Sequence, residues 1–496
     1  MTHAARPPED LAIIARGGRT NFLGFVLRLA ARLPFLFIAG RLYGAEALGR
    51  FAYAVIIVEF AAQLATLGLK RGLAHQLSTT SRPHVHVVWD GMLTAFIASA
   101  ALSAILFVFP QAMFPNSEVE GVERLLALLV FATAGSEVAL AALAYRHNIR
   151  ATVHARAIIE PWTISIAAAA LWFVSSRDGL IIAYVISMLA ALAASIWPLV
   201  KSYGLPRGWS PHPSILFAEA RANMPLAAAD AIEWGSRRLD IAILGLFFAP
   251  YWVGLYYVAQ QVASLPQKLK TSFDPILGPA ITKKLAENDL RAVARQVRQV
   301  GFWIIAAQAA IGLAFAIPAE AVLGVVGPQF VGATAVLVFL LAAEVIAATA
   351  AVSEAALVYI ARHRNLLISF GMLAAQTLLS IALILGFRAL DLPVSYQAAG
   401  PAIALCLALG LASLAKAALL KRLLEAPVSG WRWPLVWAAA AATVVGYVAT
   451  QVPEWGEILV GMPAIMLSFG LVIWHMGFLP EDRVLFRLKQ PDVPGP

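Results

Sequence analysis

SEVALAALAYRHN (residues 136–148) returns 217 residues later as SEAALVYIARHRN (residues 353–365). A second pair follows in the same order: GRFAYA (residues 49–54) is matched by GLYYVA (residues 254–259), 205 residues further along. Two matched pairs at nearly the same offset predict an internal duplication, in which each copy is one structural unit.

The composition places the duplicated units in a membrane. The 496 residues are 60% hydrophobic and 13% charged, and the mean hydropathy is +0.77. Soluble domains contain about 25% charged residues. Apolar runs of about 20 residues recur along the chain, and each is long enough to cross ~30 Å of hydrocarbon. We therefore expect an all-α polytopic membrane protein.

Fourteen segments are candidates for transmembrane helices. They are residues 20–42, 47–69, 87–109, 122–145, 157–175, 179–200, 217–248, 251–267, 300–317, 331–360, 365–387, 396–418, 433–451 and 456–479. When basic residues near the ends of these segments are counted with the side that they face, 28 of the 37 Lys and Arg residues fall on the side of the N-terminus and five on the other side, and four lie deeper within the spans. Because basic residues concentrate in cytoplasmic segments, both termini are predicted to be cytoplasmic. The net charge of +9 then needs no nucleic-acid partner.

The duplication predicts two pseudo-symmetric lobes of six helices each. The N-lobe covers residues 1–203, the C-lobe residues 204–424, and a C-terminal helix pair without a counterpart residues 425–496. Six is an even number, so both lobes enter the membrane in the same direction. Transporters with such parallel repeats hold their substrate between the two halves.

The four basic residues within spans are candidate substrate ligands. Arg28 and Arg32 lie four residues apart, on one face of the first helix. Arg237 and Arg238 lie at the matching place in the second copy. Guanidinium groups bind phosphate through two parallel hydrogen bonds, so these arginines predict a cavity for a phosphate-bearing substrate. Adjacent residues point some 100° apart, so only one of Arg237 and Arg238 is expected to face it.

Acidic residues within the spans leave two alternatives open. Glu59, Asp230, Glu233 and Asp240 are close enough in sequence or in the bundle to neutralise the arginines as internal ion pairs, or to carry coupling protons or Na⁺. Glu137 and Glu354 occupy matching repeat positions and favour structural ion pairs.

Catalytic and cofactor motifs are absent from the sequence. There is no Walker A, zincin or G-x-S-x-G motif, and the single Cys406 excludes disulfides and a metal–thiolate site. We expect no enzyme activity, cofactor or metal. A membrane-embedded glycan ligase or polymerase is the alternative from another class. It predicts basic catalytic residues in a long outer loop, and the longest outer segments, residues 110–121 and 318–330, have no Lys, Arg or His.

Three stretches carry a family resemblance. FIAGRLYGAEALGRFAYA (residues 37–54), LGLKRGL (residues 67–73) and RLDIAILGLFFAPYWVGLYYVAQ (residues 238–260) resemble the polysaccharide transport branch of the multidrug/oligosaccharidyl-lipid/polysaccharide (MOP) exporter superfamily, which includes O-antigen flippases. The resemblance extends over most of residues 12–424.

The resemblance implies two lobes in a V shape that alternate in access. It implies translocation of a lipid-linked oligosaccharide, on a polyprenyl pyrophosphate carrier, across the bacterial inner membrane for exopolysaccharide or lipopolysaccharide synthesis. The expected partners are this substrate, membrane lipids, a coupling ion and glycan-assembly enzymes. A lipid II flippase is an alternative, but the Pro-Asn-Leu-Leu-Arg pattern associated with it is missing after the first helix. A drug antiporter would carry acids and aromatic residues in that helix rather than Arg28 and Arg32.

Overall fold

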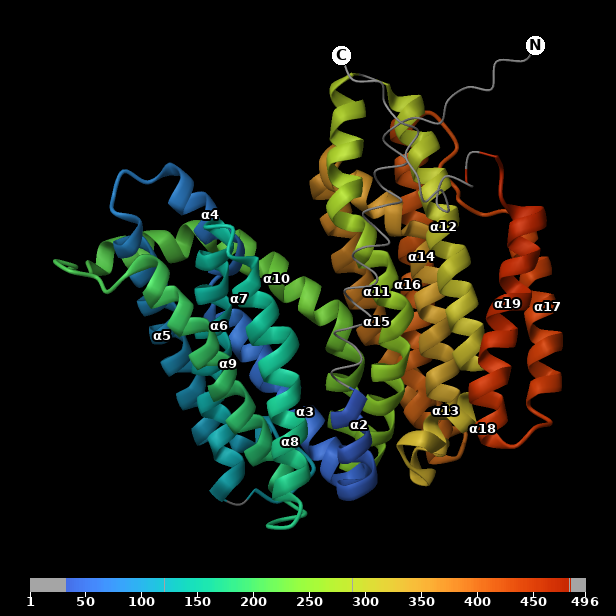
Figure 1. The fold of residues 1–496 in the computed structure, drawn as a ribbon, viewed down its shortest axis with the longest axis horizontal. Coiled ribbons are helices and arrows are strands. Elements are labelled where there is room, and N and C mark those ends of the chain that lie inside the picture. The colour runs from blue at the N-terminus through green and yellow to red at the C-terminus, as the bar shows by residue number, and fades with distance from the viewer. Residues whose placement is uncertain (1–32, 120, 288, 481, 483–496) are drawn as a thin grey trace. The chain divides into compact units, whose positions relative to one another are not determined.

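The computed structural model describes residues 33–480 and 482 except residues 120 and 288 (Figure 1). Some side chains within helices, chiefly those of residues 267–280, are not described. Within this part of the chain the structure is helical and contains no strand. A helix satisfies its own backbone hydrogen bonds, and this is what a chain in hydrocarbon requires. The all-α prediction is therefore confirmed.

The described chain divides into two compact units after Val258, within one long helix. The unit before this point is called the N-terminal unit. Its elements are α2 (Leu33–Ile38), η1 (Ala39–Tyr43), α3 (Gly44–Ala65), α4 (Leu69–Thr79), α5 (His84–Val108), η2 (Pro110–Ala112), η3 (Gly121–Arg124), α6 (Leu125–Tyr145), α7 (Ile149–Val153), η4 (His154–Ile159), α8 (Glu160–Leu171), α9 (Gly179–Tyr203), α10 (Pro213–Phe247) and the start of α11 (Pro250–Ala286).

The C-terminal unit contains the rest of α11 and everything after it. Its elements are α12 (Leu290–Ala316), α13 (Ala319–Val326), η5 (Pro328–Ala333), α14 (Thr334–Ile360), α15 (Arg362–Ala389), α16 (Val394–Leu424), α17 (Pro434–Ala449), α18 (Glu454–Gly456), η6 (Glu457–Gly461), α19 (Met462–Val472) and η7 (Ile473–Gly477). The predicted lobe boundaries at residues 203/204 and 424/425 stay predictions.

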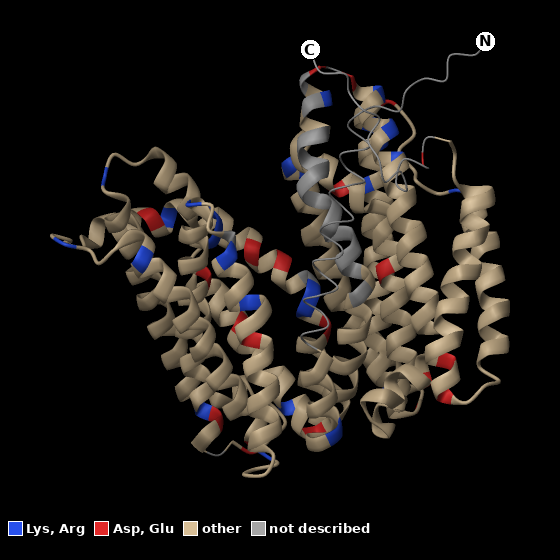
Figure 2. Cartoon of the chain, in the orientation of Figure 1, with Lys and Arg blue, Asp and Glu red and all other residues tan. Residues whose placement is uncertain are grey.

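Nine segments of the described chain are long and apolar enough to cross a membrane. Four of the predicted spans are not among them: the fifth, which contains α8, the seventh and eighth, which correspond to α10 and the start of α11, and the thirteenth, where α17 is a shorter apolar helix. The helix α10 has seven charged residues, and Figure 2 shows both signs of charge along it. The predicted count of fourteen spans and the cytoplasmic termini stay predictions.

Large apolar side chains cover much of the outer surface of the spans. Phe96, Leu367, Phe370, Leu378 and Trp437 are each at least 59% exposed. Soluble monomers rarely expose apolar surface on this scale, whereas lipid tails solvate it well. The α15 span and the last span, residues 454–477, are the plainest cases, because only 22% of the most apolar part of each is buried.

The two copies of the repeat touch each other at matching positions. A methyl group on Gly49 of α3 would overlap the carbonyl oxygen of Pro250, and one on Gly254 of α11 would overlap that of Ala45. Adding 205 to 45 and 49 gives 250 and 254, so each contact is the other with the two copies exchanged. Reciprocal contacts of this kind characterise a two-fold axis, and they support the duplication read from the sequence.

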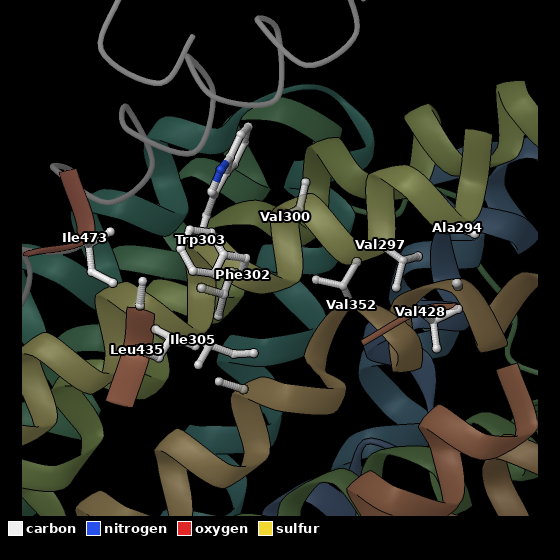
Figure 3. Packing of buried hydrophobic residues seen from close by; sticks show 14 of the residues in the cluster. Ala294, Val297, Val300, Phe302, Trp303, Ile305, Val352, Val428, Leu435 and Ile473 are labelled. Atoms are coloured by element: carbon white, nitrogen blue, oxygen red, sulfur yellow. The ribbon is translucent and has the colours of Figure 1, made fainter. Parts of the chain in front are cut away.

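A buried core joins the C-terminal helix pair to the rest of the C-terminal unit. Apolar side chains of α12, α14, α17 and η7 form one cluster, of which Figure 3 shows Phe302, Trp303, Val352, Leu435 and Ile473. The helices α17 and α19 pack on each other and on α12.

One carboxylate fastens the edge of this cluster. Asp482 is fully buried and accepts hydrogen bonds from Trp303 Nε1 (2.8 Å) and Gln299 Nε2 (2.9 Å) of α12. Arg432, just before α17, forms an ion pair with it at 2.6 Å and lies 3.9 Å over the Phe302 ring. The segment after the last span is thereby tied to α12 and to the start of α17.

Substitution Gly49→Ala tests the helix crossing. The added methyl group has no room against α11, so we expect the free energy of unfolding to fall by at least about 1–3 kcal/mol. The measurement is a lower unfolding temperature in detergent. Gly371→Ala on α15 is the control, because nothing lies within 4 Å of a methyl group there. That variant should be neutral or slightly more stable. Equal unfolding temperatures for the two variants would contradict the crossing.

Substitution Asp482→Ala tests the fastening of the helix pair. It leaves Arg432, with a side chain only 20% exposed, without its carboxylate, and loss of one partner of a buried pair costs about 3–5 kcal/mol. We expect a clearly lower unfolding temperature and faster proteolysis of α17–α19. The matched control is Asp391→Asn, an exposed residue at φ +50°, where asparagine is tolerated.

Candidate functional site

The candidate site is built on the LGLKRGL stretch, where α3 ends and α4 begins. Leu67 and Gly68 have positive φ values of 46° and 75°, so the helix breaks at this turn. A methyl group on Gly68 would lie 2.6 Å from the Asn223 carbonyl oxygen of α10, and one on Gly72 would overlap the Asn223 side chain. The two glycines thus allow α10 to lie directly against α4.

Two basic residues follow this turn and bind in different directions. Arg71 Nε lies 2.7 Å from Asp230 Oδ1, and its NH2 group lies 2.5 Å from Glu233 Oε2, both on α10. Arg237, one turn further along α10, lies 3.0 Å from the other oxygen of Glu233. We call these four residues, Arg71, Asp230, Glu233 and Arg237, the α4–α10 ion cluster.

The members of the ion cluster differ in exposure. The Asp230 side chain is 3% exposed, whereas those of Arg71, Glu233 and Arg237 are 47%, 49% and 39% exposed. Charged groups in a membrane protein face the bundle interior or a water-filled cavity, because hydrocarbon does not solvate them. The exposed side of the cluster is therefore an aqueous surface.

Lys70 points to a second network on α6. It lies 3.2 Å from Glu137, which also binds Arg156 at 2.7 Å, and Arg156 in turn binds Glu160 at 2.9 Å. These side chains are mostly buried, apart from Lys70. In the other copy, Glu354 of α14 binds Lys416 of α16 at 3.1 Å. Both matching glutamates are thus in ion pairs, as the sequence favoured.

Unused hydrogen-bonding capacity follows one face of α10. Within the described residues, Glu219 Oε2, Asn223 Nδ2, Asp230 Oδ2 and Trp234 Nε1 are buried and have no hydrogen-bond partner. Their spacing of four, seven and four places them on one helix face. Buried polar atoms normally find a partner or an ordered water, so this face is chemically equipped for more contacts than the protein itself provides.

The other predicted site residues lie in different surroundings. Arg28 and Arg32 fall outside the described residues. Arg238 is less exposed than Arg237, and Glu59 is partly buried on α3 beside Phe60, whose ring lies 4.7 Å from that of Trp234.

Asp240 is buried in a different part of α10. It accepts hydrogen bonds from Tyr256 Oη at 2.8 Å and from the Ile241 backbone N–H at 2.9 Å. These contacts tie α10 to the start of α11.

The structure brings Asp230, Glu233 and Arg237 together, and it adds Arg71, which the sequence placed in an inner loop. The only sequence signal for Arg71 was its place in LGLKRGL. In the described residues no group of three or more metal-ligating side chains occurs.

A family model, described as polysaccharide biosynthesis protein, matches residues 38–335, more than half of the chain. The chain belongs to this family. No curated protein matches it.

Solved structures with 12–13% identity share its fold. The lipid II flippase MurJ in an inward closed conformation aligns with a TM-score of 0.64, covering 91% of this chain and 97% of the other. An inward-facing multidrug resistance MATE family transporter of the MOP superfamily aligns with a TM-score of 0.63, covering 81% and 98%.

The family model thus confirms the predicted resemblance to polysaccharide proteins, and the fold is the one shared by the lipid II flippase and the MOP-superfamily transporter. The protein is a multi-pass membrane protein, and its structural neighbours are transporters rather than enzymes.

Substitution Glu137→Ala tests the second network. It leaves Lys70 without its carboxylate and leaves Arg156 with Glu160 alone. We expect a loss of about 2–3 kcal/mol, less than for a fully buried pair because the groups are partly exposed. Unfolding temperature in detergent is the measurement. Lys70→Ala should cost less, because that side chain is 45% exposed. A larger cost for Lys70→Ala than for Glu137→Ala would contradict a network centred on Glu137.

Proposed function

We propose that the protein is a flippase that moves a lipid-linked oligosaccharide across the bacterial inner membrane by alternating access. The glycan is linked through pyrophosphate to a polyprenyl carrier and serves exopolysaccharide or lipopolysaccharide synthesis. The family supplies the link to polysaccharide biosynthesis, and the fold is shared with a lipid II flippase and a drug transporter.

The observation that carries the proposal is the exposure of guanidinium groups on α4 and α10. Arg71 and Arg237 are 47% and 39% exposed on helices of a membrane bundle. A polyprenyl pyrophosphate combines an apolar tail, which stays in the lipid, with an anionic group, which needs such donors. A transported drug cation would instead call for exposed carboxylates without competing arginines.

The remaining elements of the proposal follow the sequence. Arg28, Arg32 and either Arg237 or Arg238 hold the pyrophosphate in the substrate cavity. Glu59, Asp230, Glu233 and Asp240 provide ion pairs or sites for a coupling proton or Na⁺. Glycan-assembly enzymes supply the substrate on the cytoplasmic side.

Reconstituted flipping tests the proposal. Purified protein in vesicles should translocate a fluorescent polyprenyl-pyrophosphate oligosaccharide, and Arg237→Ala should slow it at least about tenfold. That factor corresponds to one charge-assisted pair of about 1.4 kcal/mol. Arg238→Ala in parallel shows which of the two faces the substrate.

The control is Arg207→Ala, an exposed arginine of the loop between α9 and α10. Suppose that the glycan lipid crosses vesicles that contain the protein no faster than it crosses empty vesicles. If the same vesicles export cationic dyes when a proton gradient is applied, the protein is a drug antiporter and the proposal is wrong. New glycan polymer formed without translocation would replace it by the ligase.

A further inference from the structure

The α4–α10 ion cluster has the arrangement of an anion receptor that is already filled. Two guanidinium groups, one from each helix, converge on the Glu233 carboxylate, and each binds a different oxygen: Arg71 binds Oε2 at 2.5 Å and Arg237 binds Oε1 at 3.0 Å. Pairs of arginines bind carboxylate or phosphate groups in the same way, with each guanidinium donating to a different oxygen. The carboxylate occupies the place that an external anion would take.

Asp230 keeps one of the two donors in place independently of Glu233. It binds Arg71 through Nε, at 2.7 Å, while Glu233 is bound through NH2. The Asp230 side chain is buried, so the carboxylate of this pair is shielded from solvent, although the Arg71 side chain is 47% exposed. When Glu233 leaves, Arg71 remains anchored and its NH2 group remains presented.

Glu233 itself is held weakly enough to exchange. Its side chain is 49% exposed, and those of Arg71 and Arg237 are 47% and 39% exposed. Exposed ion pairs contribute little because water solvates the separated charges almost as well. A pyrophosphate group carries more negative charge than a carboxylate and has more acceptor oxygens, so it competes favourably for the same two arginines.

The charges of the cluster balance at rest. Among its four residues, two arginines face two carboxylates. Displacement of Glu233 leaves one uncompensated positive charge close to the bound anion. Return of Glu233 to the arginines then favours release, which a transporter needs because a site that binds too tightly traps its substrate.

We propose that Glu233 is an internal occupant of a phosphate-binding site formed by Arg71 and Arg237, with Asp230 as the positioning residue for Arg71, and that the pyrophosphate of the substrate displaces it. This inference rests on the proposed function for the identity of the substrate. It adds Arg71 as a substrate ligand. It also makes Glu233 a competitor of the substrate for the two arginines rather than a ligand of the substrate.

The test uses affinity for inorganic pyrophosphate, inorganic phosphate and farnesyl pyrophosphate, measured by calorimetry on the full-length protein in detergent. Glu233→Gln keeps the shape but removes the competing charge, so pyrophosphate should bind about two- to fivefold more tightly. Arg71→Ala and Arg237→Ala should each weaken it about tenfold or more. Arg207→Ala should leave it unchanged.

Two further variants separate binding from folding. Arg71→Lys retains the charge without the planar fork and should recover only part of the affinity. Asp230→Asn should weaken binding although it removes a negative charge, because Arg71 loses its anchor. The unfolding temperature of every variant is measured. The affinities of Glu233→Gln and Arg71→Lys for pyrophosphate are compared only when both variants are folded.

Weaker or unchanged pyrophosphate binding in folded Glu233→Gln would overturn the inference. Tighter binding together with slower flipping of the glycan lipid would support it fully. If Glu233→Gln binds all pyrophosphates more tightly but the protein flips no glycan lipid, the anion site stands and the proposed function fails. If the protein flips the glycan lipid but Glu233→Gln does not bind pyrophosphate more tightly, the proposed function stands and the anion site fails. Equal affinities for inorganic and farnesyl pyrophosphate would assign recognition to the phosphate alone.

Discussion

The cost of leaving a charge without a partner in an apolar bundle organises the polar part of this protein. Asp90, Glu123 and Asp482 are fully buried, and each is bound by an arginine: Arg82, Arg50 and Arg432 respectively. Buried pairs of this kind add little net stability compared with apolar packing, but breaking one is expensive. They therefore fix which segments lie together more than they strengthen the bundle, and this is the case for the helix pair held by Asp482.

The same constraint has the opposite consequence where the pair is exposed. Asp230 and Glu233 lie three residues apart on α10 and both bind Arg71, yet one is buried and the other is half exposed. Burial makes the Asp230 pair a fixed support. Exposure makes the Glu233 pair exchangeable, since water offsets most of the loss. A single arginine thus has one permanent and one replaceable partner, which is what a ligand-binding donor requires.

Local patterns in the sequence were sufficient for the all-α class and for most of the long apolar helices. Apolar runs located most spans to within a few residues, and GRFAYA and GLYYVA are the segments whose glycines meet in the structure. The region after Leu69 was expected to be an inner loop, but it is the helix α4. Lys70 and Arg71 in this helix bind carboxylates of neighbouring helices while remaining about half exposed.

The ion cluster itself was beyond sequence reasoning for a specific reason. Arg71 and Glu233 are 162 residues apart. The sequence pattern around each residue does not indicate which residue it contacts in the fold. What brings them together is the absence of side chains at Gly68 and Gly72, which lets the α10 backbone approach α4.

A glycine in a helix is usually a cost of up to about 1 kcal/mol, so Gly72 within α4 indicates a close neighbour, though not which one, whereas Gly68 is also favoured by the positive φ of the turn before α4. The same reasoning applies to Gly49 and Gly254. Glycines at matching repeat positions predict that the two copies touch there, because a contact across a two-fold axis must be accommodated by both copies at once.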